Sequence, residues 1–140
     1  MANILSAVRT YVLSKSAVTD IIGQRMYFDR LRQNATLPAA TISKISDRHD
    51  HAISDRSGLV WSRLQIVCFA ATRLACDNLA EAIYQCGIVG HKGPTSTDVA
   101  NIRGVMVEDG QRSYTLDARD GSDDHVCVTE FDLMVSYLES

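Results

Sequence analysis

The sequence lacks long apolar runs and clusters of basic residues, and each absence removes a class of protein. No apolar stretch approaches the roughly 20 residues that a membrane-spanning helix requires. The formal net charge of -3 and the lack of a basic run argue against a sequence-independent grip on nucleic acid, which depends on clustered Lys and Arg. The first residues, MANILSAVRTYVLSKS, have neither the charged start nor the uninterrupted apolar centre of a secretion signal. We therefore expect a protein that folds in the cytoplasm and does not enter a membrane.

Closely spaced cysteines are also missing. The four cysteines form no C-x-x-C pair and no dense disulfide framework. A zinc site would need closer pairs than these. Because cysteine commonly behaves as a small core residue, we expect free and mostly buried thiols at Cys68, Cys76, Cys86 and Cys127.

The usual motifs of catalysis and phosphate binding are absent or incomplete. The chain has no G-x-S-x-G elbow and no H-E-x-x-H helix. Residues 87–95, GIVGHKGPT, resemble a phosphate loop, but Lys92 is followed by Gly93 where Ser or Thr is required. Residues 118–125, ARDGSDDH, lack the full set of alternating carboxylates of a calcium loop. We therefore expect no catalytic residue, no cofactor and no metal ion.

The most informative segment that is present spans residues 57–87, because its hydrophobic period changes once, near the middle. Residues 59–70 alternate as in a strand, with Arg63 and Gln65 on the polar face. From Thr72 the period becomes helical; Thr72 can cap the helix and Gly87 can end it. The apolar face of the predicted strand carries Leu64, Ile66, Cys68 and Ala70.

The other patterns predict an α+β domain. A chain of 140 residues, 46% of them hydrophobic, has the size of one domain covering residues 1–140. We expect a mainly antiparallel sheet of about five strands with two helices, the first and the central one, packed on one face. The remaining predicted elements are a helix over 3–14, a short helical turn ending at Gly23, strands over 26–28, 39–46 and 126–139, and a hairpin over 101–118 that turns at Asp109-Gly110.

The densest group of potential metal ligands lies in a predicted hairpin tip, residues 47–58. Imidazole and carboxylate groups bind divalent metals, but the spacing here is not diagnostic. Exposed polar loops are normal between strands, so a solvated tip is the preferred interpretation and a small metal-dependent enzyme is an alternative. The group consists of Asp47, His49, Asp50, His51 and Asp55.

Two aromatic residues, Trp61 and Phe69, share a face of the predicted strand with Arg63 and Gln65. Such a face would suit single-stranded nucleic acid, because bases stack on aromatic rings. Packing at a subunit boundary or a core edge explains the two rings at least as well, because large aromatic side chains are enriched in both places. The basic footprint of a nucleic-acid-binding protein is missing. A small nucleic-acid-binding or regulatory module is therefore an alternative to a packing surface.

Several segments, in order along most of the chain, resemble the tail-completion or tail-terminator proteins of long-tailed bacteriophages, prophages and gene transfer agents. In that family a helical V-T-x-x-x-G-x-R leads into a strand with Tyr, L-P starts the next strand, and R-x-Q-(I/V)-x-x-(Y/F)-A precedes a helix rich in Ala and Leu. The matching residues are Val18, Thr19, Gly23, Arg25, Tyr27, Leu37, Pro38, Arg63, Gln65, Ile66, Phe69 and Ala70.

This resemblance implies a structural virion protein without catalytic residues. Its copies would assemble in the host cytoplasm as a ring, typically a hexamer, that caps the tail tube and joins it to the head-tail connector in the neck. An acidic lumen would let DNA pass without specific binding. We expect contacts at the 47–58 tip and the 88–100 connection; the candidate interface residues are Asp47, His49, Asp50, His51, Asp55, Arg56, Trp61, Arg63, Gln65, His91 and Lys92.

Overall fold

A computed structural model of the chain describes residues 4–31, 36–51, 56–90, 93–94, 101–117 and 125–138. Three helices and a six-stranded sheet make up the regular structure of these residues. In chain order they are α1 (Ile4–Leu13), α2 (Ser16–Ile22), β1 (Met26–Phe28), β2 (Ala39–His51), β3 (Arg56–Ala70), α3 (Arg73–Tyr84), β4 (Gly93–Pro94), β5 (Asn101–Asp117) and β6 (His125–Leu138).

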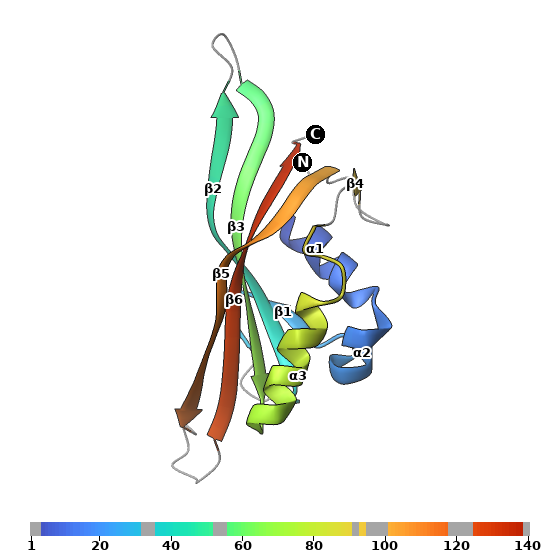
Figure 1. Ribbon diagram of the computed structural model, residues 1–140, viewed down its shortest axis with the longest axis vertical. Coiled ribbons are helices and arrows are strands. Elements are labelled where there is room, and N and C mark those ends of the chain that lie inside the picture. The colour runs from blue at the N-terminus through green and yellow to red at the C-terminus, as the bar shows by residue number, and fades with distance from the viewer. Residues whose placement is uncertain are drawn as a thin grey trace.

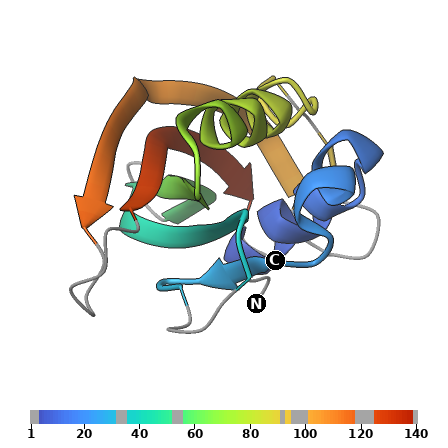
Figure 2. The same cartoon turned by 90° about the horizontal axis from the view of Figure 1, so that it is seen from below.

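The sheet has the strand order β1-β2-β3-β6-β5-β4, and every neighbouring pair is antiparallel except β1 with β2. All three helices lie on one side of it, while the β2–β3 and β5–β6 hairpins project at opposite ends (Figure 1). The view along the strands shows how strongly the sheet curves (Figure 2). The predicted mixed architecture is confirmed. The counts differ slightly, because Gly93–Pro94 adds a short strand, residues 101–117 form one strand in place of two, and Ser16–Ile22 forms a helix of its own.

The core fills the space between the sheet and the helices. The predicted alternation of β3 is confirmed, because Leu64, Ile66, Cys68 and Ala70 are all fully buried. Burying a large aliphatic side chain stabilises a fold by about 1.5–3 kcal/mol, so this face is a main source of stability. The helices contribute a matching apolar stripe: Ile4, Ala7, Val8 and Val12 from α1, Val18 and Ile22 from α2, and Cys76, Leu79, Ala80 and Ile83 from α3.

The two ends of α3 are formed as the sequence predicts. The Thr72 side chain accepts a hydrogen bond from the Ala75 N–H at 3.1 Å, which caps the first turn. The helix ends at Tyr84, and Gly87 follows with a φ of +104°. A Cβ at Gly87 would lie 2.8 Å from the hydroxyl oxygen of Tyr11 on α1. The backbone conformation therefore favours glycine here, and any added side chain would also have to displace the Tyr11 hydroxyl.

The residues behind the family resemblance have defined places near the start of the chain. Val18 is fully buried, and the Thr19 carbonyl accepts the Gly23 N–H at 2.8 Å where α2 ends. Gly23 has a φ of +57°, which turns the chain toward β1. The Arg25 Nε then donates to the Pro38 carbonyl at 3.0 Å, which ties the end of α2 to the start of β2. Burial thus explains Val18, the backbone conformation explains Gly23, and a hydrogen bond to the next strand explains Arg25.

The prediction of a long hairpin tip over residues 47–58 is wrong. β2 continues to His51 and β3 begins at Arg56, and these two residues are paired. Polar side chains stabilise this outer part of the hairpin across the strands, since Ser62 donates to the Asp47 carboxylate and the Arg48 guanidinium lies 5.8 Å from the Trp61 ring centroid. The polar composition that is typical of a loop belongs here to two paired strands.

The prediction of a turn at Asp109-Gly110 is also wrong. Residues 101–117 form one strand, and both of its halves pair with β6 instead of with each other. Register shifts lie on both sides of Asp109 and lengthen β5 relative to its partner. Asp and Gly suit such bulges for the same reason that they suit turns, because they accept unusual backbone angles. Pairing with β6 therefore makes this segment a bulged strand and not a turn.

Strand β6 lies between β3 and β5, as predicted for a strand well inside the sheet. Its apolar face is buried at Phe131, Leu133 and Val135. Its second face is less exposed to solvent than the sequence predicts, since Val128 and Asp132 on that face are also buried.

Among the described helices, none has the length and apolar character needed to cross a membrane.

Candidate functional site

The side of the sheet away from the described helices, here called the open face, carries three of the interface residues that the sequence suggests, Trp61, Arg63 and Gln65. It is formed by the odd-numbered residues 61–69 of β3 and their cross-strand partners, because the even-numbered residues of β3 point into the core. Along the strands an apolar zone with Trp61, Met106 and Met134 comes first, then a charged belt, and then a second apolar zone with Phe69, Tyr114 and Leu116.

The charged belt joins three neighbouring strands through Asp132. Arg63 on β3 donates to one carboxylate oxygen of Asp132 from Nε at 3.0 Å and from Nη2 at 2.7 Å. Arg112 on β5 donates from Nη2 to the other oxygen at 3.3 Å. The Nε of Arg112 also donates to Glu130 at 3.1 Å, and Glu130 accepts the Tyr114 hydroxyl at 3.3 Å. Two cations and two anions therefore balance each other in one network.

Burial makes Asp132 the critical member of the belt. The residue is only 3% exposed although no described helix covers it, because its neighbours on β3 and β5 fold over it. A buried carboxylate is costly unless cations and donors satisfy it. Arg63 and Arg112 meet that need, so the arginine that the sequence suggests as a contact residue is first of all a structural partner. Gln65 lies opposite Asp132 in the strand register.

Trp61 and Arg48 form the other distinctive pair of the open face. They are cross-strand partners on β3 and β2, and the guanidinium carbon of Arg48 lies 5.8 Å from the Trp61 ring centroid. This distance allows a cation-π interaction. The ring is partly buried, while Arg48 is exposed near the projecting hairpin. The pair offers a flat apolar surface with a positive rim.

Asp47 lies on the opposite side of the same hairpin. It pairs with Ser62, whose side chain alternates with those of Trp61 and Arg63 and so points to the helix side. Lys44 lies 2.9 Å from the Asp47 carboxylate, and this hydrogen bond raises the pKa of Lys44. The structure therefore does not bring Asp47 together with Trp61 and Arg63 in one site.

The remaining suggested residues divide into two groups. The backbones of His49, Asp50, His51 and Arg56 belong to the paired strands of the β2–β3 hairpin. Asp55, His91 and Lys92 lie outside the described residues. Within the described residues, no group of three or more His, Cys, Asp and Glu side chains is placed to hold a metal ion.

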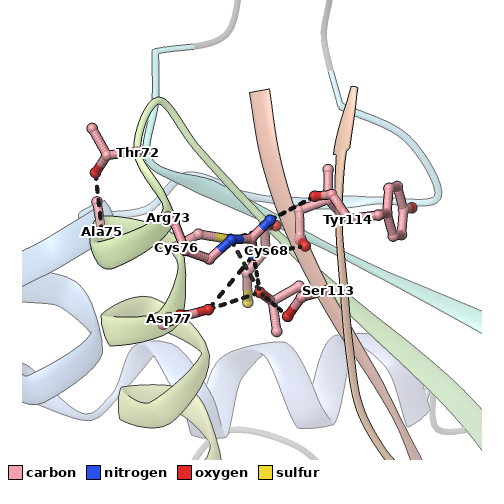
Figure 3. A network of polar contacts seen from close by, with 10 residues as sticks. Cys68, Thr72, Arg73, Ala75, Cys76, Asp77, Ser113 and Tyr114 are labelled. Atoms are coloured by element: carbon pink, nitrogen blue, oxygen red, sulfur yellow. Dashed lines mark hydrogen bonds and ion pairs between the residues drawn. The ribbon is translucent and has the colours of Figure 1, made fainter. Parts of the chain in front are cut away.

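A second polar network, which the sequence did not suggest, fixes α3 to the sheet (Figure 3). Arg73 at the start of α3 donates to the Val128 carbonyl at 3.2 Å, to the Thr129 hydroxyl at 3.1 Å and to the Tyr114 carbonyl at 2.8 Å. The Thr129 hydroxyl also donates to Asp77 at 3.2 Å. A cation in the first turn opposes the helix dipole, so Arg73 is better explained by its bonds to β5 and β6. Its partners lie 41 to 56 residues away in the chain, and no local pattern reveals them.

The cysteines form no reactive site in the described structure. Cys68 and Cys76 are buried, and the Cys76 thiol donates to the Cys68 carbonyl at 3.3 Å. Burial raises the pKa of Cys68, Cys76 and Cys86 above the ordinary value, which disfavours the reactive thiolate. All four cysteines are free, as predicted.

Comparison with known proteins gives a likeness of fold. No protein-family model matches the chain, and no curated protein matches its sequence. Among solved structures, the chain is similar to one in the virion of a native gene transfer agent particle, with a TM-score of 0.59 and 14% sequence identity. The similarity covers 96% of this chain and 94% of that chain. The two proteins therefore share a fold over almost their full lengths.

Proposed function

We propose that this chain is a structural protein of a phage-like virion, in which it acts as the ring-forming subunit that terminates the tail. The observation that carries this proposal is the fold shared with a chain of a gene transfer agent virion over nearly the whole of both chains. The segments that resemble tail-terminator proteins, which occur in the same order along the chain, support the assignment as a tail terminator. Gly23 and Arg25 from these segments have the local roles described above.

In this role the protein acts by shape and self-association and has no catalytic function. Copies, typically six, form a ring that caps the tail tube and joins it to the head-tail connector after assembly in the host cytoplasm. The net charge of -3 supports a lumen that repels DNA and lets it pass without specific binding. The neutralised arginines of the charged belt favour a packing surface over a nucleic-acid platform.

Two surfaces are proposed for contacts within the virion. The first is the pair Arg48 and Trp61, because aromatic residues and arginine are enriched at the centres of interfaces. Arg63 and Gln65 lie next to this pair on β3. Arg63 binds Asp132 in the charged belt, and Gln65 lies opposite Asp132. The second is the projecting β2–β3 hairpin together with the 88–100 connection, with Asp47, His49, Asp50, His51, Asp55, Arg56, His91 and Lys92 as candidate contact residues.

Imaging of particles tests the proposal. We expect deletion of the gene from a particle-producing strain to leave heads separate from tail tubes that lack a finished end. Wild-type protein supplied in trans should restore joined particles and should itself be found at the neck by antibody labelling. Trp61→Ala should restore fewer joined particles than Tyr27→Phe, a control outside the proposed surface. Normal particles in the deletion strain would contradict the proposal.

Oligonucleotide binding separates the proposed function from the nucleic-acid-binding alternative. We expect no saturable binding of single-stranded DNA at low salt, where electrostatic binding is strongest. Tight binding that weakens with salt and is lost in Trp61→Ala would favour the alternative.

A further inference from the structure

The two edges of the sheet are finished differently. At the β1 edge, Arg9 donates from Nε to the Met26 carbonyl at 2.7 Å. The Met26 N–H donates to the Gln24 carbonyl at 2.9 Å, and the Phe28 carbonyl accepts the Arg30 N–H at 2.8 Å. These outward groups of the short edge strand β1 are therefore occupied by its own chain, which protects an edge against added strands.

The free part of β2, beyond its pairing with β1, is protected in another way. A register shift places Ile45 in a bulge between Lys44 and Ser46. Bulges and edge lysines both hinder the approach of another strand. The start of β5 is also occupied, since β4 pairs with Asn101 and Ile102.

Within the part of the chain that the structure describes, the second half of β5, Arg112–Asp117, has none of these devices. It pairs with β6 without a register shift and contains no lysine. Residues 111–116 are exposed, with Tyr114 42% and Leu116 45% exposed. A regular, exposed edge with apolar side chains is a template for pairing with another strand. The β5–β6 hairpin projects from the body of the domain, so this edge is accessible (Figure 1).

The direction of the backbone groups on this edge follows from β6. The Val105 carbonyl accepts the Gly90 N–H at 2.8 Å, so the groups of Val105 point away from β6, and those of its partner Val135 point toward β3. Because β3 and β6 pair without interruption, the backbone groups of every second residue of β6 point toward β3, including those of Thr129 and Cys127. Their partners on β5 therefore point outward; they are Ser113 and Thr115.

We propose that the Arg112–Asp117 edge binds the same edge of a second copy of this chain, in an antiparallel pair centred on Tyr114. Paired residues of two strands must share a face of the continuous sheet. The register that sets Tyr114 beside the partner's Tyr114 meets this condition and places Ser113 opposite the partner's Thr115. Both outward residues of each copy are then hydrogen-bonded, and Arg112 faces the partner's Leu116, so no like charges oppose each other.

The β2 edge of a second copy is a poorer occupant. Its free part lies at the end of the sheet opposite to the free part of β5 (Figure 1). Joining the two would shift each copy along the strand direction, and contacts with such a shift build open helices instead of closed assemblies. The bulge at Ile45 would also interrupt the new ladder.

This contact is independent of the proposed virion function. Heterologous contacts close a ring, whereas the β5 contact is two-fold and uses the same surface on both copies. We therefore assign it to subunits outside the ring. Failure of the particle experiments would leave it intact, and its own failure would leave the ring proposal intact.

Disulfide trapping tests the register. Tyr114 and its symmetry mate form a non-hydrogen-bonded pair, in which Cβ atoms lie about 4.5–5.5 Å apart. We expect Tyr114→Cys to form a covalent dimer under mild oxidation. Leu116→Cys, on the same strand and face and equally exposed, should not, because its mate would face Arg112. Equal cross-linking of both variants, or none in Tyr114→Cys beyond that of wild type, would overturn the proposal.

A backbone substitution tests the hydrogen bonds themselves. Thr115→Pro removes an outward N–H from each copy and spares the ladder to β6, since proline is tolerated at such edge positions. With about 1 kcal/mol for each of the two lost bonds, self-association measured by sedimentation velocity should weaken at least about tenfold. Thr115→Ala keeps the N–H and should dimerise like wild type. A wild-type protein that stays monomeric at every concentration, or an unaltered Thr115→Pro dimer, would refute the contact.

Discussion

Asp132 on β6 receives two hydrogen bonds from Arg63 on a single carboxylate oxygen, at 2.7 and 3.0 Å, in a pair that spans two strands of the open face. The carboxylate is almost fully buried, while a third of the Arg63 side chain remains exposed. The bond therefore joins a buried anion to a cation that reaches solvent. It links the stability of the sheet to a surface proposed for contacts.

Arg63→Met should destabilise the protein, because the buried carboxylate of Asp132 would keep only Arg112 as a cationic partner. The expected loss is about 1–3 kcal/mol in the free energy of unfolding, measured by urea denaturation followed by circular dichroism. Lys44→Met is the control, since its exposed pair with Asp47 should contribute at most about 1 kcal/mol. Equal losses in the two variants would contradict the special role of Asp132.

Gly87→Ala should also destabilise the fold. The φ of +104° disfavours any side chain, and the new Cβ would meet the Tyr11 hydroxyl at 2.8 Å. We expect a loss of about 1–3 kcal/mol in urea denaturation. Gly90 has a similar φ of +88° but has nothing within 4 Å of an added Cβ. Gly90→Ala should therefore cost less, and a loss as large as that of Gly87→Ala would show that the Tyr11 contact is unimportant.

The buried thiols should react slowly in the folded protein. Burial raises the pKa of both Cys68 and Cys76, so little thiolate forms, and neither sulfur is accessible to a reagent. We expect iodoacetamide at pH 8, with mass spectrometry of the digested protein, to modify these two residues far more slowly than the same residues in urea. Rapid native modification of Cys76 would mean that α3 separates readily from β6.

Ionisation of Tyr114 should lower the stability of the folded protein at alkaline pH. Burial, with the charge of Glu130, raises the pKa of Tyr114 above its ordinary value in the folded state. A raised pKa means that the folded state favours the protonated hydroxyl, so this contribution is complete below the unfolded pKa of about 10 and is lost as the pH rises through the folded value. Stability curves above pH 9 should therefore fall less steeply for Tyr114→Phe than for wild type. Identical slopes would contradict the assignment.

Local patterns were sufficient for the elements whose packing is one-sided. The strand and helix on either side of Thr72 follow from their hydrophobic periods, because each buries a single face in the core. The cap at Thr72 follows from the same short stretch of sequence. These features depend on residues a few positions apart.

Features that depend on a distant partner could not be predicted in this way. Asp109-Gly110 has the composition of a turn, but its conformation is decided by pairing with β6. The same applies to Asp132, whose partner Arg63 lies 69 residues earlier in the chain. The sequence pattern predicts that Arg63 lies on the polar face of a strand, yet only the strand order shows that Asp132 neutralises its charge. The polar face of β3 can thus be predicted from the sequence, while the network on it cannot.

The uninterrupted pairing of β3 with β6 has a mechanical consequence. Each of these strands runs into one of the two projecting hairpins, and they are joined from Leu59 to Ala70 without a register shift. Tension between the two tips would load these backbone hydrogen bonds in shear, so that many must break together before the strands slide. The sheet should therefore resist a force applied along its long axis. The helices pack beside β3 and β6 and do not lie between the two hairpins that would be pulled (Figure 1).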